Sequence, residues 1–211
     1  LADCHLGPAS AAELAKVVSS AGAGLNVLAV GDNPIGSEGG STLLEAIKTS
    51  NLKIIDIGKP LPISVPYESD TLDLSKTKMG PGQVVILSWW LATPAGAAIN
   101  SIVLDGCPLT GATKDGGMFN DEWQNEDSQM DGFVALCATI GKLRTISLRD
   151  CHLGPASAAE LAKVFRNADA GVNALLLSGN GLAGAIFWND GSVQSGVDIK
   201  MDGIISLFDS L

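Results

Sequence analysis

A long internal duplication limits the folds available to this chain more than any other feature. Residues 3–17 and residues 150–164 share the same fifteen-residue sequence, DCHLGPASAAELAKV, and weaker similarity continues to Asn33 and Asn180. The two copies start 147 residues apart. This offset corresponds to about five units of about 29 residues each. Repetition at this period predicts an elongated array of units that stack on one another to bury their apolar faces.

A shorter apolar pattern recurs inside the array and defines the unit. Aliphatic residues alternate with other residues over a short segment, which indicates a strand with one buried face. The segment ends at Asn or Cys, whose side chain we expect to turn inward toward backbone groups of the turn. The clearest copies cover residues 25–35, 99–109, 143–153 and 172–182, and poorer copies cover residues 52–57 and 72–79. We assign the inward turn position to Cys4, Asn33, Cys107, Cys151 and Asn180.

A helix is expected after each turn. In the first copy of the duplication, Ser10 followed by Glu13 fits a capping box at the helix start. Ser157 and Glu160 repeat this pattern in the second copy. We therefore predict that each serine caps its own helix.

The unit length, the alternation of Cys and Asn, and the segment NPIGSEGGSTLLEAI at residues 33–47 resemble the ribonuclease-inhibitor class of leucine-rich repeats. The resemblance implies an α/β solenoid, a horseshoe with parallel strands on its concave face and helices on its convex face. It also implies protein binding, which ribonuclease inhibitors, Ran GTPase-activating proteins, tropomodulins and innate-immune sensor arms share. We expect residues 1–211 to form a single domain of six to seven irregular units and to be a fragment of a longer chain.

The units are not all complete. Only 17 residues separate Pro60 from Thr77, and the prolines in this segment predict an extended connection without a helix. Two other units carry insertions, at residues 112–128 and 184–199. Each insertion is followed by Met-Asp-Gly, at residues 130–132 and 201–203, and then by an apolar helix. Insertions at one place in different repeats map to the same rim, so these two either form a joint surface or remain separate solvated loops.

Two groups of residues are candidates for partner binding. Strand alternation places Asp56, Asp73, Asp105 and Arg149 on the concave face, as a row of acids beside one cation. Trp123 and Trp188 lie inside the two insertions. An aromatic residue in a polar loop either pins the loop to the body or anchors a partner, and both interpretations stay open here.

The Asp-Cys-His triplets at residues 3–5 and 150–152 hold reactive side chains in a row. Adjacent residues of an extended chain point to opposite sides, so each Cys is expected inside and each His at the surface, unable to act as a pair. The cysteines and histidines are not clustered at the spacing that zinc sites require. We predict no catalytic residue, no metal and no cofactor, and hence a protein that is not an enzyme.

The net charge of −10 argues against a nucleic-acid partner and permits a basic protein partner or a merely solubilising surface. Neither a membrane span nor a signal peptide is apparent, and four cysteines in a chain this apolar indicate free thiols. We therefore expect an intracellular, cytoplasmic protein. The leading hypothesis is a non-enzymatic interaction or scaffold segment. Its rivals are a GTPase-activating protein like the Ran-specific family and a permanent structural subunit of a large assembly.

Overall fold

The computed structural model describes residues 1–20, 24–114, 123–166, 171–184, 186–187, 193–195 and 200–210. Six α-helices, one 3-10 helix and eleven short strands lie within these ranges. The helices are α1 (Pro8–Ser20), α2 (Gly36–Thr49), α3 (Pro81–Leu91), η1 (Pro94–Gly96), α4 (Asp131–Ile140), α5 (Pro155–Phe165) and α6 (Asp202–Phe208). The strands are β1 (Val27–Ala29), β2 (Ile54–Asp56), β3 (Pro60–Pro62), β4 (Thr71–Asp73), β5 (Ser101–Val103), β6 (Thr113–Lys114), β7 (Trp123–Gln124), β8 (Thr145–Ser147), β9 (Ala174–Leu176), β10 (Ile186–Phe187) and β11 (Val193–Ser195).

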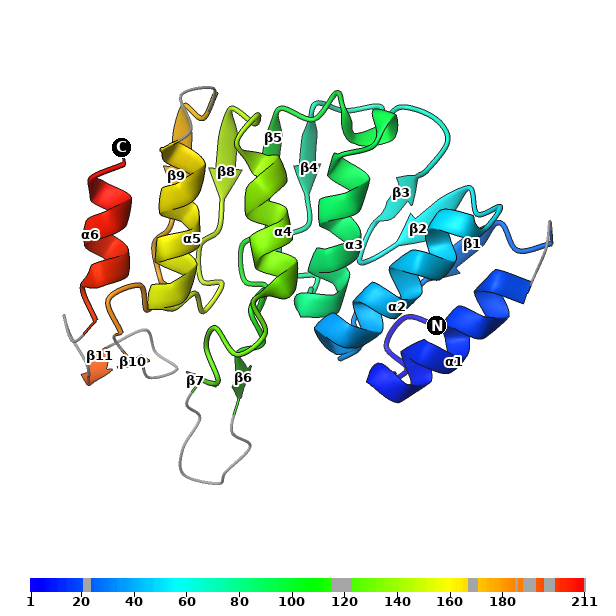
Figure 1. Ribbon diagram of the computed structural model, residues 1–211, viewed down its shortest axis with the longest axis horizontal. Coiled ribbons are helices and arrows are strands. Elements are labelled where there is room, and N and C mark those ends of the chain that lie inside the picture. The colour runs from blue at the N-terminus through cyan, green and yellow to red at the C-terminus, as the bar shows by residue number, and fades with distance from the viewer. Residues whose placement is uncertain are drawn as a thin grey trace.

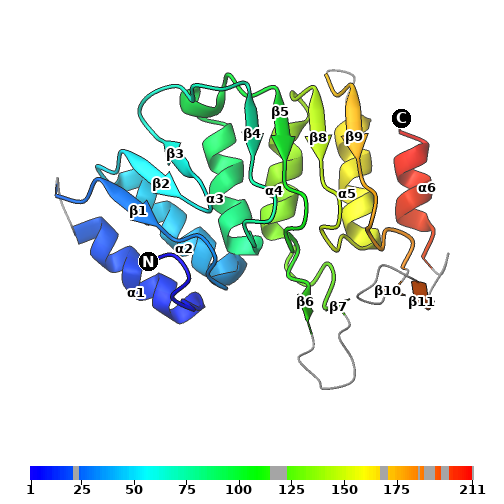
Figure 2. The same ribbon diagram turned by 180° about the vertical axis from the view of Figure 1, so that it is seen from behind.

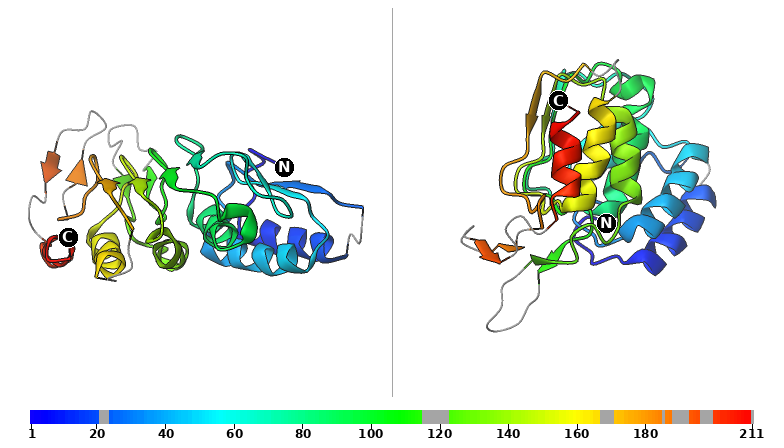
Figure 3. Two further views of the ribbon diagram at one scale, coloured as in Figure 1. Left: turned by 90° about the horizontal axis from the view of Figure 1, so that it is seen from above. Right: turned by 60° about the vertical axis from the view of Figure 1, so that its left-hand side comes forward.

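The helices and strands form two layers. Helices α1 to α6 lie side by side in chain order, with the two termini at opposite ends of the row (Figure 1). The strands form the other layer, which faces the viewer in Figure 2. From above, the helices occupy one side of the molecule and the strands the other (Figure 3). Most units contribute a strand to one layer and a helix to the other, so successive units cover one another's apolar faces.

In the strand layer, neighbouring strands of the successive units pair in parallel, with one exception. Strands β4, β5, β8 and β9 form a four-stranded sheet in which every adjacent pair is parallel. Strands β1 and β2 are also parallel, but β3 pairs with β2 in the antiparallel direction and closes that sheet. The strands fall where the alternating pattern predicts them, as Ile102, Ile146 and Leu175 on adjacent strands illustrate. The parallel arrangement that the resemblance implies does not hold at β3, which is antiparallel to β2.

The interruption lies in the proline-rich segment after β2. No helix occurs between β2 and β4, which confirms the predicted extended connection. Helix α3 packs on α2, and its Gln83 side chain is buried. Its Nε2 donates hydrogen bonds to the carbonyls of Val30, at 3.1 Å, and Asn33, at 2.7 Å. A side chain of α3 thus satisfies backbone carbonyls in the turn between β1 and α2, the helix on which α3 packs.

Glycines at the helix N-termini allow neighbouring helices to approach closely. A Cβ atom on Gly82 of α3 would lie 2.4 Å from the carbonyl oxygen of Gly36. The corresponding glycines are Gly132 of α4 and Gly203 of α6. A Cβ atom added there would lie 2.6 Å from the Pro81 oxygen and 2.2 Å from the Pro155 oxygen, respectively. Helix α5 has alanine at this position, and a groove of about 740 Å³ separates it from α4.

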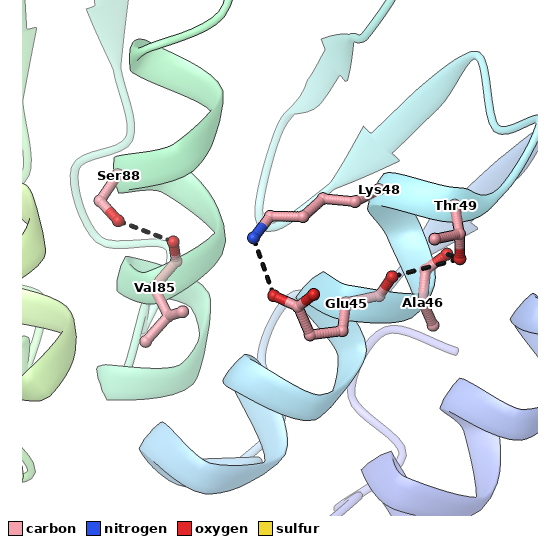
Figure 4. Close-up of polar contacts among 6 residues, drawn as sticks. All are labelled: Glu45, Ala46, Lys48, Thr49, Val85 and Ser88. Carbon is pink, nitrogen blue, oxygen red and sulfur yellow. Dashed lines mark hydrogen bonds and ion pairs between the residues drawn. The ribbon is translucent and has the colours of Figure 1, made fainter.

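The core is aliphatic, as the low aromatic content requires. Its two largest fully buried side chains are Trp90 and Phe133. Trp90 is buried while its neighbour Trp89 is only half-buried, in agreement with their adjacent positions on α3. Polar side chains on the helices mostly bond within their own helix. Figure 4 shows Lys48 paired with Glu45 at 2.8 Å and Ser88 donating to the Val85 carbonyl at 2.8 Å.

Candidate functional site

The two turn asparagines hold successive units together. The Asn180 Oδ1 atom accepts hydrogen bonds from the backbone N–H groups of Cys151, at 3.0 Å, and Leu153, at 3.1 Å. Its Nδ2 atom donates to the carbonyls of Leu148, at 2.7 Å, and Leu177, at 2.8 Å. Asn33 bonds in the same way to the turn of the preceding unit, through Cys4 and Leu6. Each amide therefore joins the turns of two neighbouring units.

The turn cysteines occupy the same interior line. The Sγ atom of Cys107 donates to the Leu74 carbonyl at 3.4 Å, and that of Cys151 donates to the Leu104 carbonyl at 3.2 Å. Burial raises the pKa of the Cys151 thiol far above its ordinary value, so the thiol stays protonated at neutral pH and is a poor nucleophile. All four cysteines are free thiols. Cys4, which was assigned the same inward position, is exposed, and its Sγ atom donates to the Ala2 carbonyl at 3.5 Å.

The acids predicted to form a row on the concave face lie on or directly after three different strands. Asp56 belongs to the β1–β2–β3 sheet, whereas Asp73 lies on β4 in register with Val103, two residues before Asp105. Asp56 and Asp73 each accept a hydrogen bond from a backbone N–H two residues on. The hydrogen bonds from Ser75 lower the pKa of Asp73.

The carboxylate of Asp105 likewise accepts hydrogen bonds from other residues of the chain. Its Oδ1 atom accepts hydrogen bonds from the Ser147 hydroxyl, at 2.6 Å, and from the Arg149 backbone N–H, at 2.9 Å. These bonds tie the turn after β5 to the turn after β8. The Arg149 side chain itself is exposed.

The two insertions begin as antiparallel hairpins on one edge of the molecule. Strands β6 and β7 pair in the first insertion, and β10 and β11 pair in the second. Both hairpins lie at the same edge of the two layers, beside the N-terminal ends of α4 to α6 (Figures 1 and 2). Trp188 lies outside the described residues, as do parts of both insertions.

Trp123 of β7 stacks on His152. The ring centroids are 3.5 Å apart and the planes are inclined by 20°, and Lys114 Nζ lies 5.6 Å from the Trp123 ring. Trp123 thus pins the hairpin to the turn before α5, and His152 is half-buried rather than at the surface as predicted. Burial, assisted by the charge of Lys114, lowers the pKa of His152 to about 4. His5, which occupies the same position in the first copy, is exposed.

A carboxylate from the first insertion caps α5. Asp127 accepts hydrogen bonds from the backbone N–H groups of Gly154, at 3.1 Å, Ala156, at 2.8 Å, and Ser157, at 3.2 Å, and from the Ser157 hydroxyl. The helix begins at Pro155, two residues before Ser157, and its N-cap residue makes no side-chain cap. The predicted capping box at Ser157 is therefore wrong, because the free N–H groups find their acceptor in another unit.

Gln129 anchors the other side of the same segment. Its Oε1 atom accepts a hydrogen bond from the Ser37 backbone N–H at 2.9 Å, at the start of α2. Its own backbone N–H donates to the Thr110 carbonyl at 2.9 Å. Hydrogen bonds thus join residues 125–129 to the start of α2 and to the start of α5.

A groove of about 670 Å³ lies between the bases of the two hairpins, and we call it the rim groove. It is lined by Trp123, Gln124, Asn125, Glu126, Asp127, Pro155, Ala156, Gly184 and Lys200. Glu126 is half-buried there, and burial together with the negative charge of Asp127 raises its pKa to about 7. Lys200 acts in the opposite direction. This groove is not predictable from local sequence, because it forms only where residues of two distant insertions meet.

Two further findings concern metal binding and membrane crossing. Within the described ranges, no three His, Cys, Asp or Glu side chains are grouped so that they could hold a metal ion. Within the same ranges, no helix has the length and apolar character needed to cross a membrane.

Residues 25–44 match a family model described as Leucine Rich repeat. This segment contains β1, the turn at Asn33 and the first part of α2, so the match falls on one complete strand–turn–helix transition. A comparison of the chain with curated proteins finds no match. The matched segment supports a leucine-rich-repeat protein, and such repeats are typically protein-interaction domains rather than enzymes.

Proposed function

We propose that this chain is part of a leucine-rich-repeat solenoid of the ribonuclease-inhibitor-like class, and that it binds a protein partner through the rim groove. The observation that carries the proposal is the half-buried Glu126 in a groove between two anchored hairpins. The partner offers a basic segment, a Lys or Arg side chain of which pairs with Glu126. Such a segment also complements the chain's net charge of −10.

The cost of keeping Glu126 in the groove supports a binding role. Its ionised form is disfavoured by burial and by Asp127, and among the described residues no hydrogen bond to its carboxylate is present. A carboxylate in this condition reduces stability unless a cation reaches it. Strongly perturbed ionisable groups in clefts are frequent at functional sites.

The groove is also organised before any partner arrives. The Trp123–His152 stack and the bonds of Asp127 and Gln129 fix one wall to the helices. A prearranged wall loses little conformational freedom on binding, which favours affinity. The concave-face residues Asp56, Asp73 and Asp105 are weaker candidates, because each already accepts a backbone hydrogen bond.

Affinity capture with matched charge reversals tests the proposal. Glu126→Lys should lose a captured protein that the wild type retains, whereas Glu13→Lys, an equal charge change on the exposed face of α1, should keep it. The triple variant Asp56→Lys, Asp73→Lys, Asp105→Lys should also keep it. The purified partner should then bind more weakly as salt is raised, because ionic pairing is screened.

Loss of binding in the triple variant with retention in Glu126→Lys would refute the rim groove and favour the concave face. A scaffold role is supported if the captured complex is reversible, and a permanent structural subunit if it survives purification in fixed stoichiometry. The activity of a Ran-specific-type GTPase activator would appear as accelerated GTP hydrolysis by a captured GTPase.

A further inference from the structure

The row of helices opens between α4 and α5. At three other places in the row a glycine in the first turn of a helix, Gly82, Gly132 or Gly203, lies against the backbone of the preceding helix unit. Helix α5 has Ala156 at this position and begins against the Asp127 carboxylate instead. The groove of about 740 Å³ lies between these two helices, and we call it the helix groove. Each of its two helices has another helix on its far side (Figure 1).

Helix α4 lines the helix groove with an apolar stripe. Val134, Cys137, Ala138 and Gly141 follow one another at the three- and four-residue spacing that places side chains on one face of a helix. Val134 is 43% exposed, while Cys137 is 6% exposed. The stripe extends over about two helical turns. Its side chains are small below Val134, so they leave room for the side chains of a further helix.

Helix α5 provides the opposite wall with the same spacing. Glu160, Lys163 and Val164 line the groove, and Val164 is 8% exposed at its floor. Glu160 and Lys163 form an ion pair at 2.5 Å. Burial, together with the charge of Glu160, raises the pKa of Cys137 to about 12. The two walls therefore face one another across a groove that is apolar along α4 and charged along α5.

The charge at the helix groove differs in sign from that of the whole chain. Among the described residues, the charged side chains that line it are Lys142, Lys163 and Glu160. The chain as a whole has 13 basic and 23 acidic residues. Lys142 is exposed just after α4, and its Nζ donates to the Leu91 carbonyl at 2.7 Å. An ammonium group has three donors, so Lys142 keeps donors for a partner. The charge complementarity favours an acidic ligand here.

We propose that the helix groove binds an acidic amphipathic helix of a protein partner. The apolar side chains of that helix pack on the α4 stripe, and its acidic side chains reach Lys142 and Lys163. A helix suits the groove because side chains at three- and four-residue spacing interdigitate with stripes of the same spacing. The net charge of −10 disfavours an acidic ligand over the rest of the surface, so its binding reports on this groove. The proposal does not depend on the rim groove, which takes a basic segment.

Fluorescence anisotropy with two labelled synthetic peptides tests the proposal. Both have about 18 residues, enough for a helix, and carry the same leucine ridge at three- and four-residue spacing. One has glutamate and the other lysine on the polar face. The glutamate peptide should bind the purified chain with a Kd of about 50 μM. Val134→Glu should weaken this binding by more than about tenfold, and Lys142→Glu by about fivefold, because the first blocks the stripe and the second reverses the cation.

Matched variants separate the helix groove from the rest of the surface. Val65→Glu adds the same charge at a residue that is 59% exposed between β3 and β4, and it should bind the glutamate peptide like the wild type. Glu126→Gln, in the rim groove, should also leave this binding unchanged. The circular dichroism spectrum of each variant verifies its fold, which both exposed valines allow. Absence of binding at about 1 mM glutamate peptide overturns the proposal. So do equal losses in Val134→Glu and Val65→Glu, or a loss in Val134→Glu that affects the lysine peptide but not the glutamate peptide.

Discussion

The cap that Asp127 provides for α5 can be tested against a control contained in the same chain. Ser157 is fully buried and its hydroxyl donates to Asp127, whereas Ser10, in an identical helix start, is exposed. Ser157→Ala removes a hydrogen bond to a charged acceptor and should lower the free energy of unfolding by about 2 kcal/mol. Ser10→Ala should change it by less than about 0.5 kcal/mol, as is usual for exposed positions.

Asp127→Ala should cost more than Ser157→Ala. It removes the cap from three backbone N–H groups, worth about 1 kcal/mol, and leaves the buried Ser157 hydroxyl without an acceptor, which adds about 2 kcal/mol. In the background of Asp127→Ala, replacing Ser157 should cost little further, because its acceptor is already gone. The two changes should therefore be non-additive by more than about 1 kcal/mol.

Urea denaturation followed by circular dichroism measures these differences. With a slope of about 2 kcal/mol per molar urea, Ser157→Ala should lower the midpoint by about 1 M while Ser10→Ala leaves it nearly unchanged. Equal effects of the two serine substitutions would refute the reasoning, because they would assign the cost to the local helix start. Additive effects of Asp127→Ala and Ser157→Ala would refute the hydrogen bond between these two side chains.

Three further predictions concern the turn asparagines and the residues at and near the rim groove. Asn180→Ala should destabilise the fold by about 3 kcal/mol in the same urea assay, since two N–H groups and two carbonyls lose their partner. Trp123→Ala should raise the pKa of His152 from about 4 toward 6.5 in an NMR titration. An unchanged pKa would contradict the burial of His152 assigned to the stack. The pKa of Glu126 is raised from 4.5 to about 7 in the folded state, so the folded chain binds more protons in this window and gains stability as pH falls through it. Glu126→Gln should therefore be more stable than the wild type at pH 8, and the difference should vanish toward pH 4.5.

The strand–turn–helix units were predictable because their signals are local. Alternating apolar residues place β5, β8 and β9 correctly, since one buried face requires this pattern at every strand. The prolines after β2 likewise predict a segment without a helix. The antiparallel pairing of β3 was not predictable, because Pro60 and Pro62 discourage a strand and only the open edge of β2 provides a partner. The rim groove escaped prediction for a related reason, since Glu126 and Lys200 are brought together by the stacking of whole units.

The duplicated fifteen residues separate what local sequence determines from what neighbouring units determine. Both copies form a turn followed by a helix that starts at proline, and in both the Asp and His that flank the Cys adopt a left-handed backbone conformation. Their exposure differs, however, as do their hydrogen bonds, because Asp127 and Trp123 reach only the second copy. No property of the shared sequence distinguishes a buried Cys151 from an exposed Cys4. The chemistry of such a residue in a repeat protein is therefore a property of the adjacent unit, and assigning it requires knowing which unit lies next to it.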